Sequence, residues 1–293
     1  MDKVIVSRLA GGLGNQMFQY AAARALAHHH NASLLVDTSF LGSGNSVADH
    51  TIRDFELDVY KVQTSIASDR LLADIRPGKM IRILNRLGLI KNRITTIDEN
   101  DITNPGDLSG YEPPLYLTGY WQNENYFLSI RDILLKEFVP KNEMSAQNRQ
   151  VSLLIAGSNS ASVHVRRGDY ITNSNANKFH GVCSVEYYQS AISKLMEDTG
   201  VNHFFAFSDD IAWTKENLMF PVPVTFVDHN HGKESYRDMI LMSQCNHQII
   251  ANSSFSWWGA WLNPGENKVV IAPANWFAAG GGDKIVPDNW IKL

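Results

Sequence analysis

Several features that would assign a protein to a special class are missing from this sequence. Only two of its 293 residues are cysteines, Cys183 and Cys245, and they lie too far apart to suggest the disulfide framework of a small secreted domain. No segment approaches the roughly 18 consecutive apolar residues of a membrane-spanning helix. The apolar run near the N-terminus is short for a signal peptide, and glycines follow it at once. We therefore expect a soluble, cytoplasmic protein.

A strong excess of charge of either sign is also lacking. The formal net charge is −4 and the isoelectric point is about 6.2. Nucleic acid is therefore not an expected partner, and any binding of a phosphate group must be local. Hydrophobic residues make up 44% of the chain and charged residues 19%. This composition can supply the core of one large globular domain or of two ordinary ones.

Positive charge gathers in one stretch, residues 70–93, where basic residues alternate with leucine and isoleucine. These residues are Arg70, Arg76, Lys79, Arg82, Arg86, Lys91 and Arg93, and Asp74 is the only acid among them. A solvated basic face of a helix is the simpler interpretation. The alternative is peripheral contact with a membrane or a lipid-linked substrate.

Strand-like and helix-like segments alternate in the first half of the chain. An apolar strand at residues 3–9 is followed by a glycine turn, an alanine-rich helix at 15–30 and a second strand at 33–37. Later, "LYLTGYWQNENYF" predicts a strand and an aromatic loop, and a helix is expected from about Asn125 to Phe138. This order is typical of a nucleotide-binding α/β domain.

The second half alternates more regularly. Strands are expected at 161–166, 203–208, 247–252 and 268–273, and helices at 184–198, 234–244 and 254–262. Short strands separated by helices indicate a mostly parallel sheet. A turn-rich stretch from Val139 to Ser160 is the expected domain junction. The sequence thus predicts an α/β fold of two Rossmann-like domains, residues 1–155 and 156–293, that face each other across a cleft.

Two adjacent arginines end the strand in "ASVHVRRGDYI". Strand alternation places His164 and Arg166 on one face and Arg167 on the other, so the two arginines should do different jobs. A guanidinium is planar, permanently charged and able to bind two phosphate oxygens at once. We expect one arginine to face a ligand and the other to pair internally, with Asp169 as a candidate partner. The alternative is a purely structural cluster of ion pairs.

The segment "NSSFSWWGAWL" has a related arrangement. Ser253 and Ser254 open a helix directly after an apolar strand, and backbone N–H groups at a helix start can bind anions. A plain helix cap is the simpler interpretation. The tryptophans of this helix, Trp257, Trp258 and Trp261, are expected in the core.

Two further motifs are weaker when taken alone. "GGLGNQ" is a glycine turn with Asn15 and Gln16 as amide donors, but it lacks the lysine of a P-loop and the third glycine of the dinucleotide fingerprint. A dehydrogenase is disfavoured for that reason. In "FSDD", Asp209 and Asp210 could hold a metal on a diphosphate, but a cap on the following helix is the favoured interpretation.

Two isolated acids are also candidates. Asp238 lies in an otherwise apolar helix, where it either pairs with Arg237 or Lys233 at the surface or accepts hydrogen bonds from guanine. Asp37 ends the second strand and is a candidate to bind the hydroxyls of an acceptor.

Together, "GGLGNQMFQYAAARALA", "YWQNENYF", "HVRRGDY", "FSDD" and "NSSFSWWGAWL" resemble the α-1,2-fucosyltransferases of glycosyltransferase family 11, in the family's order and over nearly the whole chain. The resemblance implies a GT-B fold, GDP-fucose as the donor, inversion at the anomeric carbon, and neither cofactor nor metal. It implies that residues 156–293 bind GDP-fucose and residues 1–155 the acceptor, a galactose-terminated oligosaccharide or glycolipid-linked glycan. Alternatives are a related enzyme of another linkage and a non-catalytic nucleotide- or glycan-binding protein.

The resemblance also implies roles for individual residues. Arg166 would bind the β-phosphate, His164 would lie against the nucleotide, and Asp238 would read guanine. The remaining assignments are Ser253, Ser254 and Phe255 to the phosphates and ribose, Gly14 and Asn15 to the diphosphate and fucose, and Asp37 and Gln16 to the acceptor. Arg166, Asn15 and Asp169 are the candidate catalytic residues. Asp169 is a candidate base, but orienting Arg166 or Arg167 is its favoured role, and the sequence singles out no acid as the base. The glutamate that some α-1,6 enzymes use after the basic motif has no counterpart before Glu186.

Overall fold

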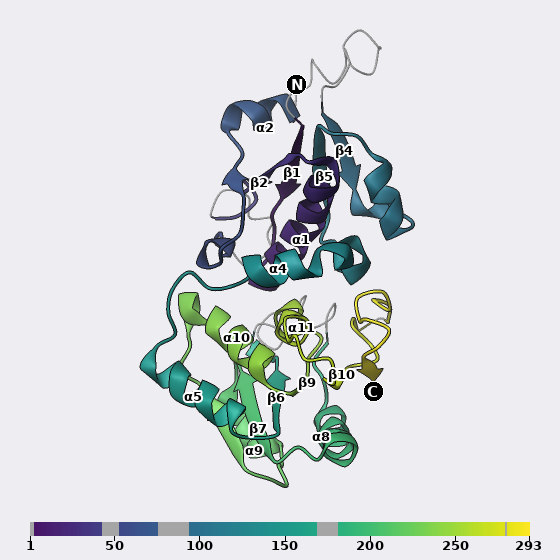
Figure 1. Cartoon of the computed structure of the whole chain (residues 1–293). Coiled ribbons are helices and arrows are strands. Elements are labelled where there is room, and N and C mark those ends of the chain that lie inside the picture. The colour runs from purple at the N-terminus through teal and green to yellow at the C-terminus, as the bar shows by residue number, and fades with distance from the viewer. Residues whose placement is uncertain (1–2, 43–52, 76–93, 169–180, 279) are drawn as a thin grey trace. The chain divides into compact units, whose positions relative to one another are not determined.

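The computed structural model describes residues 3–42, 53–75, 94–168, 181–278 and 280–293 (Figure 1). Two compact units divide the chain between Lys141 and Asn142. This division lies inside the expected junction but earlier than residue 155, because helix α5 (Ala146–Ala156) packs against helix α10 (Tyr236–Gln244) of the second unit. Most of the basic stretch, residues 76–93, lies outside the described residues.

The first unit contains a parallel five-stranded sheet. Its strands, in spatial order, are β3 (Ser65–Ile66), β2 (Ser33–Asp37), β1 (Val4–Arg8), β5 (Leu115–Thr118) and β4 (Thr95–Asp98). Its α-helices are α1 (Leu13–His30), α2 (Asp69–Ile75) and α4 (Arg131–Glu137). From β1 the chain forms β2 and then β3, at one edge of the sheet. It then crosses to the other side of β1, where it forms β4 and β5. The switch point of this sheet therefore lies between β1 and β5.

Helix α1 is the core of the first unit. Every residue from Gln16 to Ala23 is buried, as expected for a helix covered on all sides. Tyr20 donates a hydrogen bond to Glu137 Oε2 at 2.7 Å, and Arg24 Nε donates to Glu137 Oε1 at 3.0 Å. Burial, followed by the contact with Glu137, raises the pKa of the Tyr20 phenol. This buried carboxylate therefore ties α1 to α4.

The second unit contains a parallel six-stranded sheet. Its spatial order is β11 (Ile291–Lys292), β10 (Val270–Ala272), β9 (His247–Ile249), β6 (Ser160–Val165), β7 (His203–Ser208) and β8 (Val224–Val227). The remaining helices are α8 (Val185–Thr199), α9 (Ile211–Asn217) and α11 (Ser254–Trp261). Counted from β6, this is the doubly wound order 3-2-1-4-5-6, whose switch point lies between its first and fourth strands, here β6 and β9.

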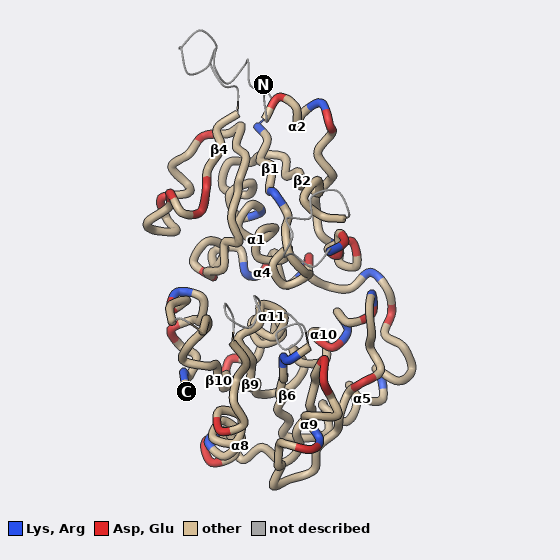
Figure 2. The backbone as a smooth tube through the Cα atoms, turned by 180° about the vertical axis from the view of Figure 1, so that it is seen from behind, with Lys and Arg blue, Asp and Glu red and all other residues tan. Residues whose placement is uncertain are grey.

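The expected strands and helices of this unit are confirmed, and the three tryptophans of α11 are buried. One boundary in the first unit was wrong: residues 124–130 form two 3-10 turns, so α4 begins only at Arg131. Helix α5 inside the junction was not expected. Basic and acidic residues are interspersed along both units (Figure 2). No described helix is long and apolar enough to cross a membrane.

Candidate functional site

The motifs of the second unit meet at the switch point of its sheet. Strand β6 pairs with β9 through Val163 and Ile249, so the chain leaves both strands at nearly the same level. The arginine pair follows β6, and the serine loop follows β9. In open α/β sheets, ligands bind beyond the carboxyl ends of the strands at this point. The topology thus brings together two motifs that are separated by some ninety residues of sequence.

The two arginines have different partners, as strand alternation predicted. Arg166 Nη1 lies 2.8 Å from Asp209 Oδ2. Arg167 Nε lies 3.6 Å from Asp210 Oδ2, and its guanidinium covers the ring of Trp213 at 3.7 Å. Arg167 is therefore built into the packing against α9. Arg166, whose side chain is 26% exposed, is anchored from one side by a carboxylate.

Asp209 does more than pair with Arg166. Its Oδ1 accepts from Arg167 N at 2.8 Å, and its Oδ2 accepts from Gly168 N at 3.0 Å. A Cβ atom at Gly168 would lie 2.7 Å from Asp209 Oδ2, so only glycine fits this approach. Asp209 thus clamps the chain that leaves β6. The expected helix cap is confirmed for Asp210, whose Oδ1 accepts from Trp213 N at 3.1 Å.

The clamp role of Asp209 was missed from the sequence. The available signal was that both motifs end strands, and β6 and β7 turn out to be parallel neighbours. Asp169, the candidate partner and base, lies outside the described residues.

His164 joins the arginine motif to the serine motif. Its side chain is buried, and its ring lies 5.7 Å from the ring of Phe255 at 37°. Burial lowers the pKa of His164 to about 4, an effect that Asp209 opposes and Arg166 reinforces. The imidazole is therefore neutral near pH 7, and its Nδ1 has no hydrogen-bond partner among the described residues.

The start of α11 offers backbone N–H groups, rather than serine hydroxyls, as hydrogen-bond donors. Ser253 occupies the N-cap position, but its side chain makes no capping hydrogen bond, and its N–H donates to the carbonyl of Ala251 at 2.8 Å. The N–H groups of Ser254 and Phe255 follow in the first turn, where a helix has no internal acceptors. Asn252, the residue before Ser253, helps to line a pocket of about 280 Å³.

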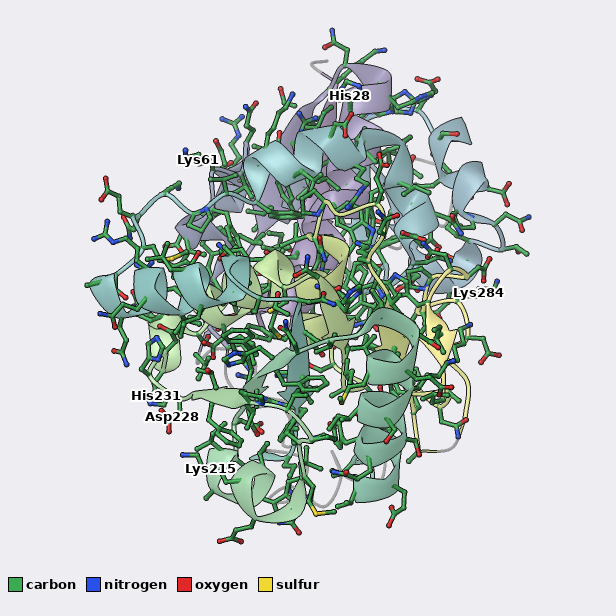
Figure 3. All side chains as sticks on the ribbon, turned by 60° about the horizontal axis from the view of Figure 1, so that its bottom comes forward. His28, Lys61, Lys215, Asp228, His231 and Lys284 are labelled. Carbon is green, nitrogen blue, oxygen red and sulfur yellow. The ribbon has the colours of Figure 1, made fainter. Side chains whose placement is uncertain are left out.

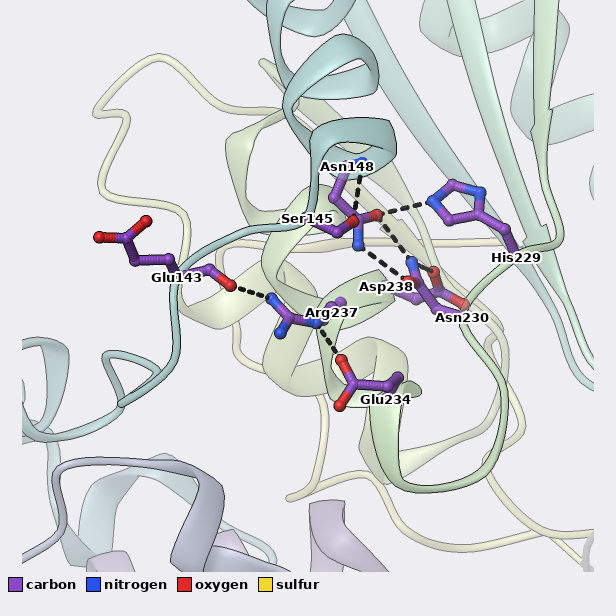
Figure 4. A network of polar contacts seen from close by, with 8 residues as sticks. All are labelled: Glu143, Ser145, Asn148, His229, Asn230, Glu234, Arg237 and Asp238. Atoms are coloured by element: carbon purple, nitrogen blue, oxygen red, sulfur yellow. Dashed lines mark hydrogen bonds and ion pairs between the residues drawn. The ribbon is translucent and has the colours of Figure 1, made fainter.

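Asp238 lies in the first turn of α10 and is half-buried. Its Oδ1 accepts from Asn230 Nδ2 at 2.7 Å (Figure 4). The alternative pairing with Arg237 was wrong, because Arg237 pairs with Glu234 and donates to the carbonyl of Glu143. Burial raises the pKa of Asp238 to about 7, although the hydrogen bond from Asn230 lowers it. Strongly shifted pKa values are typical of functional sites, so this carboxyl is a candidate ligand contact.

The motifs of the first unit also meet at a switch point, between β1 and β5. Asn15, which is partly exposed, accepts a hydrogen bond at Oδ1 from Gln122 Nε2 at 2.8 Å. Gly11 has φ of +78°, and a Cβ atom there would lie 2.5 Å from Asn15 Nδ2. Gly14 is buried in the same turn. Gln122, from the aromatic loop, is a neighbour that sequence reasoning did not single out.

The two residues assigned to the acceptor are buried. Gln16 donates to the carbonyls of Gly11 at 2.9 Å and Asp54 at 2.8 Å, and it accepts from Glu56 N at 2.9 Å. Asp37 accepts from the Tyr116 hydroxyl at 2.6 Å. Both side chains are 0% exposed. Neither is available to an acceptor in this structure, and we assign both to the scaffold of the loops.

Among the residues that the structure describes, no group of three or more His, Cys, Asp or Glu side chains could hold a metal ion. The two acids considered for that purpose, Asp209 and Asp210, are engaged by the arginine motif and by α9.

Several known proteins are similar to this chain. The family model described as Glycosyl transferase family 11 matches residues 103–293. An α-1,2-colitosyltransferase of Escherichia coli is 36% identical over 99% of both chains. The O-antigen biosynthesis glycosyltransferase WbnK of Escherichia coli is 38% identical over 98% of this chain and 99% of its own. A galactoside α-(1,2)-fucosyltransferase 2 of Bos taurus is 31% identical over 51% of this chain and 45% of its own.

A solved structure gives the fold. A GDP complex of an Arabidopsis thaliana FUT1 variant matches with a TM-score of 0.50 over 98% of this chain and 72% of that one, at 12% identity. This likeness shows a common α/β fold of the GT-B type.

The clamp generates a prediction about stability. Asp209→Ala removes an acceptor from two backbone N–H groups and from Arg166, so we expect a loss of roughly 1–3 kcal/mol in the free energy of unfolding. Urea denaturation measures this loss. The matched control is Asp228→Ala, after the neighbouring strand β8, where the exposed carboxylate lies 3.8 Å from Lys215 (Figure 3). An equal loss in both variants would show that Asp209 holds nothing in place.

Proposed function

The chain belongs to glycosyl transferase family 11, and we propose that it is an inverting enzyme that moves L-fucose from GDP-fucose to the 2-hydroxyl of a terminal galactoside without a metal. One observation carries this proposal. Arg166, His164 and the first turn of α11 converge at the switch point of the second unit, where α/β folds bind nucleotides.

In the proposed reaction, the departing diphosphate is the group that the protein must stabilise. As the bond between the anomeric carbon and GDP lengthens, the sugar gains oxocarbenium character and the β-phosphate gains negative charge. Groups that are already aimed at that charge stabilise the transition state more than the ground state. The guanidinium of Arg166 can bind two oxygens, and the N–H groups of Ser254 and Phe255 can supply further donors. Asp209 positions Arg166 so that little reorganisation is needed.

The attacking hydroxyl loses its proton late in such a reaction, so a strong base is not required. Asp169 remains our candidate base. Asn15 remains our proposed amide contact to the sugar, and its side chain is oriented by the hydrogen bond from Gln122. His164 is neutral near pH 7 and can lie against the nucleotide without adding charge.

The acceptor is proposed from the names of the relatives. A galactoside acceptor agrees with the bovine relative, and a glycolipid-linked bacterial glycan agrees with the O-antigen relative. The colitosyltransferase favours a second donor, since colitose is fucose without its 3-hydroxyl. Contact of residues 70–93 with a membrane remains part of this proposal.

A donor and acceptor panel tests the proposed function. GDP-fucose and GDP-colitose are each incubated with galactose-terminated acceptors, and the product linkage is read by NMR. We expect an α-1,2-linked fucosyl product at the same rate in excess EDTA. Loss of activity under chelation that Mg²⁺ restores would contradict the metal-free mechanism. If the protein turns over GDP-colitose only, the proposed donor is wrong but the proposed site stands.

The arginine pair gives a second prediction. Arg166→Lys keeps the charge but loses the planar fork, so we expect kcat to fall by about 10²–10³ while GDP affinity falls less. Arg167→Lys is the matched control: it loses the stacking on Trp213, worth about 1 kcal/mol of stability, but keeps most activity per folded molecule. If instead Arg167→Lys is folded and inactive while Arg166→Lys is active, the catalytic arginine is the other one.

Asp238 gives a third prediction, on pH. The pKa of this carboxyl is raised to about 7, and only the ionised form accepts both N–H groups of guanine. The competent fraction therefore grows with pH, and GDP affinity should rise roughly tenfold between pH 6 and pH 8. Calorimetry should show weak, pH-independent binding of GDP to Asp238→Asn. A flat profile in the wild type would remove Asp238 from the nucleotide site.

A further inference from the structure

Behind Asp238 lies a pair of buried side-chain amides (Figure 4). Asn148 Nδ2, on α5, donates to Asn230 Oδ1 at 2.8 Å, and Asn230 Nδ2 donates back to Asn148 Oδ1 at 2.9 Å. The two residues are 1% and 7% exposed. Such a reciprocal pair can form only when both amides lie face to face in one orientation.

The outer hydrogen bonds fix that orientation. The second N–H of Asn230 is used on Asp238 Oδ1 at 2.7 Å. His229 Nε2 lies 2.8 Å from Asn148 Oδ1, which requires the proton on Nε2. A flipped Asn230 would place its oxygen against the oxygens of both Asn148 and Asp238. The amide of Asn230 is thus locked, and it holds Oδ1 of Asp238 in place while leaving Oδ2 and the second lone pair of Oδ1 for two further donors.

We propose that the Asn148–Asn230 pair positions Asp238 and thereby sets the preference of this site for a guanine nucleotide, although neither amide touches the ligand. This inference rests on the proposed function. Guanine offers two adjacent N–H donors to a carboxylate, whereas adenine offers a ring nitrogen that accepts. Discrimination between the two bases therefore depends on a carboxylate that is both correctly oriented and ionised.

The second condition, that Asp238 is ionised, depends on the charges around this residue. Burial and Asp228 favour the protonated carboxyl, whereas the hydrogen bond from Asn230 favours the ionised form. On α10 itself, Arg237 is engaged by Glu234. Helix α11 has no charged side chain, and the only one on α5, Arg149, is exposed. Removal of Asn230 should therefore raise the pKa of Asp238 further.

The test compares GDP and ADP binding by calorimetry from pH 6 to pH 9. The variants are Asn230→Ala, Asn148→Ala and the isosteric Asn148→Asp. The control is Ser152→Ala, which removes a 2.7 Å hydrogen bond from Ser152 to Gln244, also between α5 and α10 but remote from Asp238. Melting temperatures are measured for all of them. If one Asn148 variant does not fold, the others carry the test.

We expect each asparagine variant to bind GDP about tenfold more weakly at pH 7, the scale for losing one hydrogen bond to a charged group. The pH midpoint of GDP binding should move upward in Asn230→Ala, and affinity should recover toward pH 9. The preference for GDP over ADP should shrink, whereas Ser152→Ala should behave as the wild type.

A merely structural role would weaken GDP binding equally at every pH, and unchanged midpoints in folded variants would overturn the inference. The proposed function would fail differently: the wild type itself would bind GDP and ADP equally, or Asp238→Asn would bind GDP as well as the wild type does.

Discussion

The parallel register of β6 between β7 and β9 is the constraint on which the candidate donor site depends. Because all three strands run the same way, the arginine motif, the paired aspartates and the serine loop emerge at one edge of the sheet. The ion pair of Arg166 with Asp209 and the ring contact of His164 with Phe255 are consequences of this register. A shift by one residue would exchange the positions of Arg166 and Arg167 and so exchange their partners.

Buried polar side chains support the exposed ones in both units. In the first unit, Gln16 and Gln19 hold the glycine turn by hydrogen bonds to backbone groups of three separate loops. In the second, Asn148 and Asn230 hold Asp238. A buried amide left without partners costs free energy, so such groups fix one loop conformation. The residues that would meet a substrate thereby keep their orientation without being buried themselves.

Much of the fold and part of the site could be predicted from the sequence, since those inferences used local periodicity. Alternation along β6 predicted different roles for Arg166 and Arg167, and the structure gives them different partners. Their roles stay a prediction. The two units divide within the stretch named as the junction, but α5 inside it was missed because its first half, residues 146–150, is mostly polar and shows no apolar repeat of helical period. Asp37 and Gln16 looked like ligand contacts because they end a strand and open a helix. Their burial depends on Tyr116 and on residues 54–56, which no local pattern connects to them.

The sequence by itself determined the α/β class, four of the six strands of the second sheet with the helices between them, and the family, because each of these follows from short-range pattern and motif. It did not indicate β8 or β11. Only the tertiary structure decided which aspartate clamps the arginine motif and which amides hold Asp238. Asp209 lies 42 residues from Arg167, and Asn148 lies 82 residues from Asn230. Contacts at such separations are set by strand order and by the packing of α5 on α10, and no local propensity specifies them.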